Sequence, residues 1–118
     1  MIGLGYSLAE SFNPTSTEAQ VVVDGRVSLL SLVVHVQGIT TNFAIEPLVF
    51  RNKDASGDVR YKFRPWCIKN ATGPVFNHLS YQVNMGSAGI LFEEGIYFEW
   101  EAAGGSDEGV DNVVLFYM

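Results

Sequence analysis

The chain has 118 residues, 47% of them hydrophobic and 17% charged, so it can bury one core and is too apolar to be intrinsically disordered. Its net charge of −6 disfavours a phosphate backbone or an anionic membrane as a partner. No apolar run has the length of a membrane-spanning helix. Residues 1–5 lack the basic start and long apolar run of a signal peptide, and the single cysteine allows no disulfide within one chain, which fits assembly in a reducing cytoplasm.

Hydrophobic and polar residues alternate along most of the chain, which indicates β-strands separated by turns. In chain order the predicted strands lie at about 3–10, 19–24, 26–37, 42–50, 59–64, 75–83, 96–100 and 113–118, with a short buried run at 90–92. This pattern predicts an all-β fold: an antiparallel β-sandwich of jelly-roll or immunoglobulin-like type, with about eight strands, in a single domain spanning 1–118.

The clearest local signal is Asp24-Gly25, between the strands at 19–24 and 26–37. Asp-Gly suits a two-residue hairpin turn because both turn positions need a positive φ, so we expect these strands to pair. In the second strand Leu30, Leu32, Val34 and Val36 are expected to face the core. Ser31, His35 and Gln37 are expected on a mixed opposite face, together with Val33.

Two prolines interrupt the pattern. Pro47 lies inside the run 42–50, and because proline cannot donate a ladder hydrogen bond we expect an edge or a bulge there. Pro14 belongs to the polar break 13–17, which would allow residues 1–17 to act as an N-terminal arm that reaches a neighbour.

No catalytic, cofactor or metal motif emerges from the sequence, and we expect a non-enzymatic protein without cofactors. His35, His78 and Cys67 match no zinc spacing, and Cys67 is expected to be a buried, unreactive hydrophobe. Glu93 and Glu94 are adjacent, so they should point to opposite faces as solvated turn charges. Two acidic loops could hold calcium weakly, but neither has the spacing of a known calcium loop; their carboxylates are Asp54, Asp58, Asp107, Glu108 and Asp111.

The aromatic residues are the unusual feature of this chain. Tyr97, Trp100, Phe116 and Tyr117 are expected to fall in adjacent late strands with mixed phase, so both faces there should carry large apolar groups. A small sandwich has only one interior, and apolar groups on an outer face favour a partner. We therefore expect self-association. The candidate interaction residues are Tyr97, Trp100, Phe116, Tyr117 and Pro47.

The segment 89–98, the Gly-rich loop after it and the terminal strand 112–117 together resemble small virion proteins of tailed bacteriophages, which often end in such a hairpin, loop and aromatic strand. The segment 48–57 resembles the strand and polar turn of those proteins. The resemblance covers under half of the chain. It implies a capsid decoration or cement protein of β-sandwich type on the virion surface, assembled in the host cytoplasm, with the major capsid protein or other virion proteins as partners. It also favours a homotrimer, because three-fold sites are common anchoring points on capsids.

Three other functions stay open from the sequence. The protein could be a head–tail or tail component of the virion, or a carbohydrate-binding sandwich with Trp66 and Trp100 as sugar platforms. It could also be an interaction domain of another kind. An enzyme is the least favoured class.

Overall fold

A computed structural model of the chain describes residues 8–14, 19–37, 47–64, 69–70, 73–74, 78–101 and 110–118. The strands within these residues are β1 (Leu8–Phe12), β2 (Gln20–Asp24), β3 (Val27–Gln37), β4 (Leu48–Asn52), β5 (Val59–Phe63), β6 (Lys69–Asn70), β7 (Gly73–Pro74), β8 (His78–Asn84), β9 (Ile90–Phe92), β10 (Gly95–Trp100) and β11 (Val110–Tyr117). The described residues include no helix with the length and apolarity that a membrane crossing requires.

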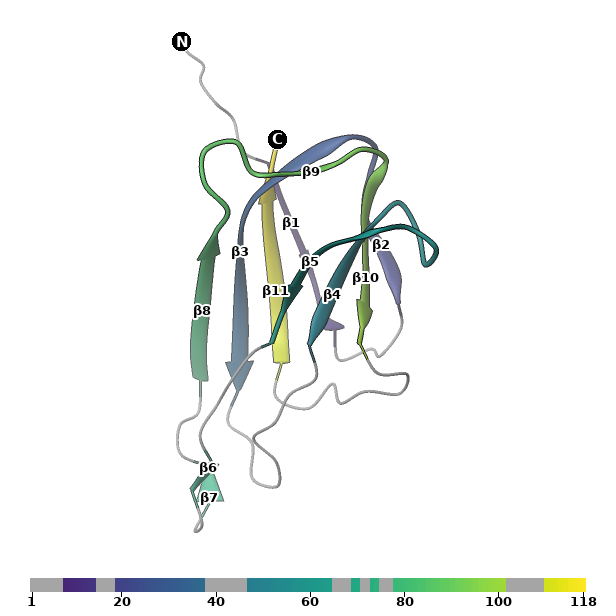
Figure 1. Ribbon diagram of the computed structural model, residues 1–118. Coiled ribbons are helices and arrows are strands. Elements are labelled where there is room, and N and C mark those ends of the chain that lie inside the picture. Colours follow the sequence, from purple (N-terminus) through teal and green to yellow (C-terminus); the bar gives the residue numbers. More distant parts are fainter. Residues whose placement is uncertain are drawn as a thin grey trace.

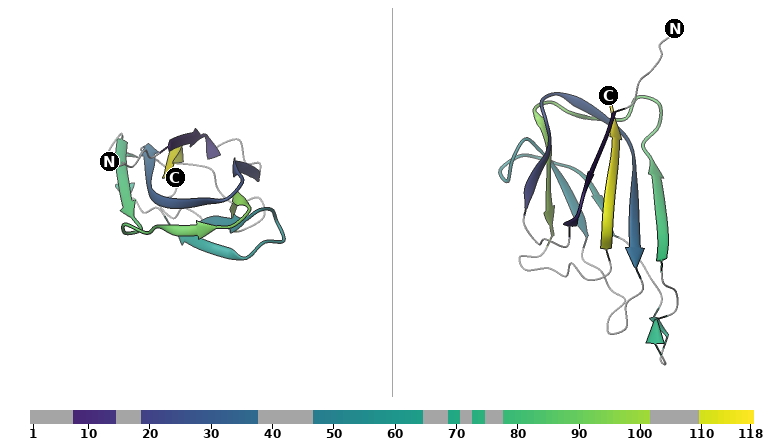
Figure 2. Two further views of the ribbon diagram at one scale, coloured as in Figure 1. Left: turned by 90° about the horizontal axis from the view of Figure 1, so that it is seen from above. Right: turned by 180° about the vertical axis from the view of Figure 1, so that it is seen from behind.

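Two antiparallel sheets pack face to face (Figures 1 and 2). Sheet A has five strands: four in the order β1-β11-β3-β8, and β9, which pairs with the first part of β3. Sheet B has four strands in the order β2-β10-β4-β5, and β6 pairs with β7 apart from both sheets. The predicted all-β sandwich is confirmed, with nine strands in its two sheets where the sequence indicated about eight.

Two turns carry the chain from one sheet to the other, and they lie side by side. The turn at Asp24-Gly25 leads from β2 in sheet B to β3 in sheet A, and the turn at Glu93-Glu94 leads from β9 in sheet A back to β10 in sheet B. Asp24 is in register with Gly95, and the Gly25 N–H donates to the Glu94 carbonyl at 3.3 Å. The predicted hairpin at Asp24-Gly25 is therefore wrong. Gly25 does have the expected positive φ, of 90°, but it serves an arch between sheets.

A β-bulge changes the predicted phase of β3. Phe116 of β11 is in register with Ser31 and Tyr117 with Leu29, so Leu30 is the extra residue. Leu29, Leu32, Val34 and Val36 are fully buried, whereas Leu30 is only half-buried. The expected core face is thus confirmed from Leu32 onward, and Leu29 takes the place expected for Leu30.

An aromatic cluster holds the two sheets together. The Phe98 ring lies at the centre of this cluster, with centroids 4.9 Å from Phe12, 5.8 Å from Phe50 and 5.6 Å from Trp100. The Trp100 Nε1–H donates to the Pro14 carbonyl at 3.2 Å, which gives this buried indole a hydrogen-bond partner. The core therefore draws on β1 of sheet A and on β4 and β10 of sheet B.

Two expectations about the prolines change. β4 begins at Leu48, directly after Pro47, and it lies between β10 and β5, so the edge expected near Pro47 is wrong for the described part of this run. Leu8–Phe12 of the expected N-terminal arm is strand β1, which pairs with β11. Of the predicted strand at 3–10, residues 8–10 belong to β1, which continues to Phe12. Residues 1–7, 15–18 and 42–46 lie outside the described residues.

Candidate interaction surface

The outer face of sheet A is uncharged in the described side chains. Strand register places its residues in three rows, because the alternate positions on these strands fill the core. The rows are Ala9, Phe116, Ser31 and Asn84; Ser11, Val114, Val33 and Gln82; and Asn112, His35 and Ser80. The apolar members sit on the two central strands, and small polar side chains surround them. This set of residues is named the uncharged face below.

One polar contact and one buried oxygen mark the third row of the uncharged face. His35 Nδ1 and Ser80 Oγ share a hydrogen bond of 2.7 Å across β3 and β8. The Oδ1 atom of Asn112, beside His35 in the ladder, is buried and has no hydrogen-bond partner. An unsatisfied buried amide oxygen is normally costly, so Asn112 is a locally unfavourable feature at this end of the face.

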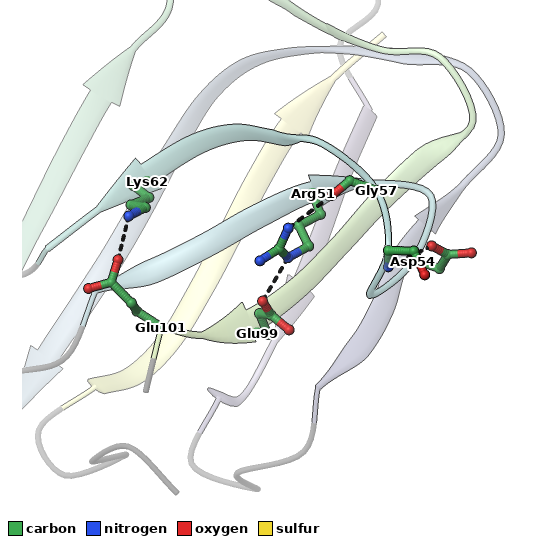
Figure 3. A network of polar contacts seen from close by, with 7 residues as sticks. Arg51, Asp54, Gly57, Lys62, Glu99 and Glu101 are labelled. Carbon is green, nitrogen blue, oxygen red and sulfur yellow. Dashed lines mark hydrogen bonds and ion pairs between the residues drawn. The ribbon is translucent and has the colours of Figure 1, made fainter. Parts of the chain in front are cut away.

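The outer face of sheet B has the opposite character, because cations and carboxylates alternate on it. Arg51 Nε donates to Glu99 at 2.7 Å, and Arg51 Nη1 also donates to the Gly57 carbonyl at 2.9 Å (Figure 3). Lys62 pairs with Glu101 on the neighbouring part of this face. These charges neutralise one another within the protein, so the face has little unsatisfied charge to offer a partner.

Tyr97 lies in the middle of the outer face of sheet B. It is in register with Val21 on one side and Arg51 on the other, and it is partly buried. Partial desolvation, followed by the negative charge of Glu99, raises the pKa of the Tyr97 phenol above its ordinary value. The Tyr97 side chain is therefore neutral and partly buried on an otherwise charged face. Val21, beside it, is 54% exposed.

The turns at one end of the sandwich are fastened to each other by hydrogen bonds. The Lys53 N–H donates to the Gly95 carbonyl at 2.9 Å, and the Asn52 side chain accepts from the Glu94 N–H at 2.9 Å. Asp54 accepts from the Ser56 N–H at 2.9 Å, which closes the turn that follows β4 (Figure 3). This end of the sandwich is thus a rigid, polar surface.

The structure separates the residues that the sequence grouped as interaction candidates. Phe116 belongs to the uncharged face, whereas Tyr97 is on the outer face of sheet B, and β10 and β11 are in different sheets and are not neighbours. Trp100 is 7% exposed and belongs to the core, and Tyr117 packs against the core. Pro47 is half-buried at the start of β4, where its carbonyl accepts from Glu101 N–H at 3.0 Å. The argument that both faces of adjacent late strands carry aromatic groups is therefore wrong.

The remaining candidates have simple positions where the structure describes them. Glu93 and Glu94 are exposed turn charges, as predicted, and they pair with Arg60 and Lys53. No three His, Cys, Asp or Glu side chains of the described residues gather as a metal site would need. The side chains of His78 and Asp111, and the whole of Trp66, Cys67, Asp107 and Glu108, lie outside what the structure describes.

Sequence reasoning missed the role of Val33 and Val114 in the uncharged face. The alternation in 31–37 did indicate a mixed outer face, but its neighbours β8 and β11 are distant in sequence. Only the register shows that the described outward side chains of these three strands are uncharged. No family model, no curated protein and no solved structure matches the chain.

Proposed function

We propose that the protein is a non-enzymatic virion structural protein of a tailed bacteriophage, a capsid decoration or cement protein that binds the outer capsid surface through its uncharged face. The observation that carries the proposal is the contrast between the two outer faces: one charged and internally neutralised, the other uncharged with Phe116, Val114 and Val33 at its centre. The resemblance to small phage virion proteins supplies the kind of partner.

The resembling segments support the proposal by their place in the fold. Residues 89–98 form β9, the arch and the first part of β10, and residues 48–57 form β4 and the turn after it. Residues 112–117 belong to β11, which lies between β1 and β3 in sheet A. The resemblance therefore concerns strands that build both sheets, and it includes the residues Phe116 and Val114 of the uncharged face.

The charge distribution supports the choice of the uncharged face as the docking surface. Binding through the outer face of sheet B would require desolvation of Arg51, Glu99, Lys62 and Glu101, which are already paired. Binding through the uncharged face removes apolar and small polar groups from water instead. On a shell that offers many equivalent sites, each contact can be modest and the array still stabilises the particle.

A binding assay on capsids tests this proposal with a matched pair of variants. Capsids of the encoding phage, assembled without this protein, are mixed with the wild-type chain, with Val114→Lys or with Val21→Lys, and then pelleted and heated. Val114 lies on the uncharged face and Val21 on the outer face of sheet B, so both variants add one lysine to an outer strand position. Thermal unfolding of each variant checks that it folds.

We expect the wild type and Val21→Lys to bind and to raise the rupture temperature of the particle. Val114→Lys should bind at least about tenfold more weakly, because a lysine charge would be buried without a partner. Capsids that stay bare with the wild type contradict the decoration function, and equal losses in both variants contradict the choice of face. Binding confined to the portal or the tail favours a head–tail component, and binding to glycans instead favours the carbohydrate alternative.

A further inference from the structure

Strand β8 is an edge strand of sheet A in the part of the chain that the structure describes. It is the outermost strand of that sheet in every view (Figures 1 and 2), and among the described residues it pairs with β3 on one side only. Its seven residues, HLSYQVN, include no charge and no proline. Such an edge presents a row of backbone N–H and C=O groups that can pair with another strand.

The other edge strands of the two sheets carry features that discourage pairing. β9, which pairs only with β3, has three residues. β5 has Arg60 and Lys62 and a register shift opposite Arg51. β2 is a five-residue strand with a bulge at Val22. β1 has five residues, includes Glu10 and lies against β2. Charges, bulges and short length are the usual protections of edge strands, and β8 has none of them.

We propose that β8 pairs antiparallel with β8 of a second copy of this chain, across a two-fold axis at Tyr81. In this register Tyr81 lies opposite Tyr81 of the second copy, Ser80 lies opposite Gln82, and the pairing extends to residues 78 and 84. The strand is self-complementary in this alignment, because exposed polar residues of the outer phase meet each other and residues of the inner phase meet each other. A two-fold axis makes the two halves of the interface identical.

The distribution of charge favours a second copy of this chain as the partner of the β8 edge. Each chain has a net charge of −6, so two copies repel wherever their carboxylates approach. Pairing through β8 brings together the longest edge strand, which has no charge, and joins the uncharged faces of both copies into one surface. Tyr81 packs on Phe63 with centroids 5.8 Å apart, so β8 is held in a strand conformation before it meets a partner.

This inference does not depend on whether the protein binds a capsid, and it differs from the trimer that the phage resemblance favours. A closed two-fold pair through β8 gives a dimer. The predicted dimer joins the backbones of two sheets, whereas the capsid contact proposed above uses side chains of the uncharged face.

Two double variants of the full chain test the pairing. In Ser80→Lys/Gln82→Lys, each lysine would lie opposite a lysine of the second copy. In Ser80→Lys/Gln82→Glu, each lysine would lie opposite a glutamate. Both positions are exposed, and both variants lose the same hydrogen bond to His35, so the variants differ only in the sign of one charge. Sedimentation velocity across micromolar to sub-millimolar concentrations measures the mass of each protein.

We expect the wild type and Ser80→Lys/Gln82→Glu to reach twice the 13.0 kDa chain mass. Ser80→Lys/Gln82→Lys should dimerise at least about tenfold more weakly, because two pairs of like charges oppose each other directly. A wild type that stays monomeric or forms a trimer overturns the proposal, and so does a dimer that both variants retain equally. Far-UV circular dichroism of the variants distinguishes lost pairing from lost folding.

Discussion

The paired arches between the sheets predict unequal effects of the same substitution at two neighbouring glycines. A Cβ atom at Gly95, where φ is 130°, would lie 2.6 Å from the Val23 carbonyl oxygen and 3.3 Å from the Gly25 nitrogen. A Cβ atom at Gly25, where φ is 90°, would have no atom within 4 Å. Gly25→Ala therefore changes only the backbone preference, whereas Gly95→Ala also pushes the two arches apart.

The magnitudes follow from those contacts. An alanine at positive φ costs about 1–2 kcal/mol, which applies to both variants. The collision at Gly95→Ala adds about 2 kcal/mol for displaced backbone and for weakened hydrogen bonds between the arches. At about 4 °C per kcal/mol for a chain of this size, the expected losses in Tm are about 4–8 °C for Gly25→Ala and about 12–16 °C for Gly95→Ala.

Thermal unfolding followed by circular dichroism, repeated in urea, measures both losses. The urea slope should stay at its wild-type value, so that a shift in midpoint reports stability alone. Equal losses in the two variants would refute the arrangement, because they would mean that the backbone at Gly95 does not lie against Val23. A smaller loss for Gly95→Ala than for Gly25→Ala would refute it more strongly.

Other predictions concern the core, the charged face and high pH. Trp100→Phe should lower the free energy of unfolding by about 2 kcal/mol, as measured by urea unfolding. The substitution removes the hydrogen-bond donor of the buried Pro14 carbonyl, and the smaller ring fills less of the core. Arg51→Ala should lower the free energy of unfolding by about 1 kcal/mol and Glu99→Ala by less, because only the arginine has a second hydrogen bond. If the ion pair contributes, the difference in stability between each variant and the wild type should shrink in high salt. Desolvation raises the pKa of Tyr61 and Tyr97 above 10.0, so the folded state favours the neutral phenols. The stabilising contribution of these neutral phenols is complete below pH 10 and is lost as the pH rises further. Tm should therefore fall above pH 10, and it should fall less steeply with pH in Tyr61→Phe. An equally steep fall of Tm with pH in the wild type and in Tyr61→Phe would argue against this.

The strands were predictable from sequence because alternation is a local property. Val59, Tyr61 and Phe63 indicate a half-buried strand without knowledge of any other part of the chain, and the structure has β5 there. The same applies to the short run at 90–92, which is β9. The all-β class follows from the sum of such signals.

The pairing of those strands was not predictable in the same way. A positive φ at Gly25 serves a hairpin and an arch equally well. The choice depends on β10, which is distant in sequence and pairs with β2. The bulge at Leu30 depends on β11, which is more distant still. Local patterns therefore indicated which segments are strands, while contacts between distant segments decided their sheet, register and phase.

The candidate surface was predictable only in part for the same reason. Phe116 was identified as an exposed aromatic, and it does lie on the uncharged face. The sequence suggested that the strand of Trp100 lies next to the last strand, with the indole as an interaction candidate. In the structure Trp100 has the same phase in β10 as Phe98 and Ile96, so its side chain lies in the core. The position of the opposite sheet decides which face of an alternating strand points to the core and which points to water.

The most direct test of the central proposal uses the tailed phage in which that proposal places this chain: its capsids are mixed with the purified protein and reconstructed by cryo-electron microscopy. We predict density for the sandwich on the outer surface of the shell, with Phe116 and Val114 of sheet A toward the capsid protein and the Arg51–Glu99 pair of sheet B toward solvent. A shell without added density would contradict the decoration function. Bound protein with sheet B toward the shell would contradict the assignment of the uncharged face as the docking surface.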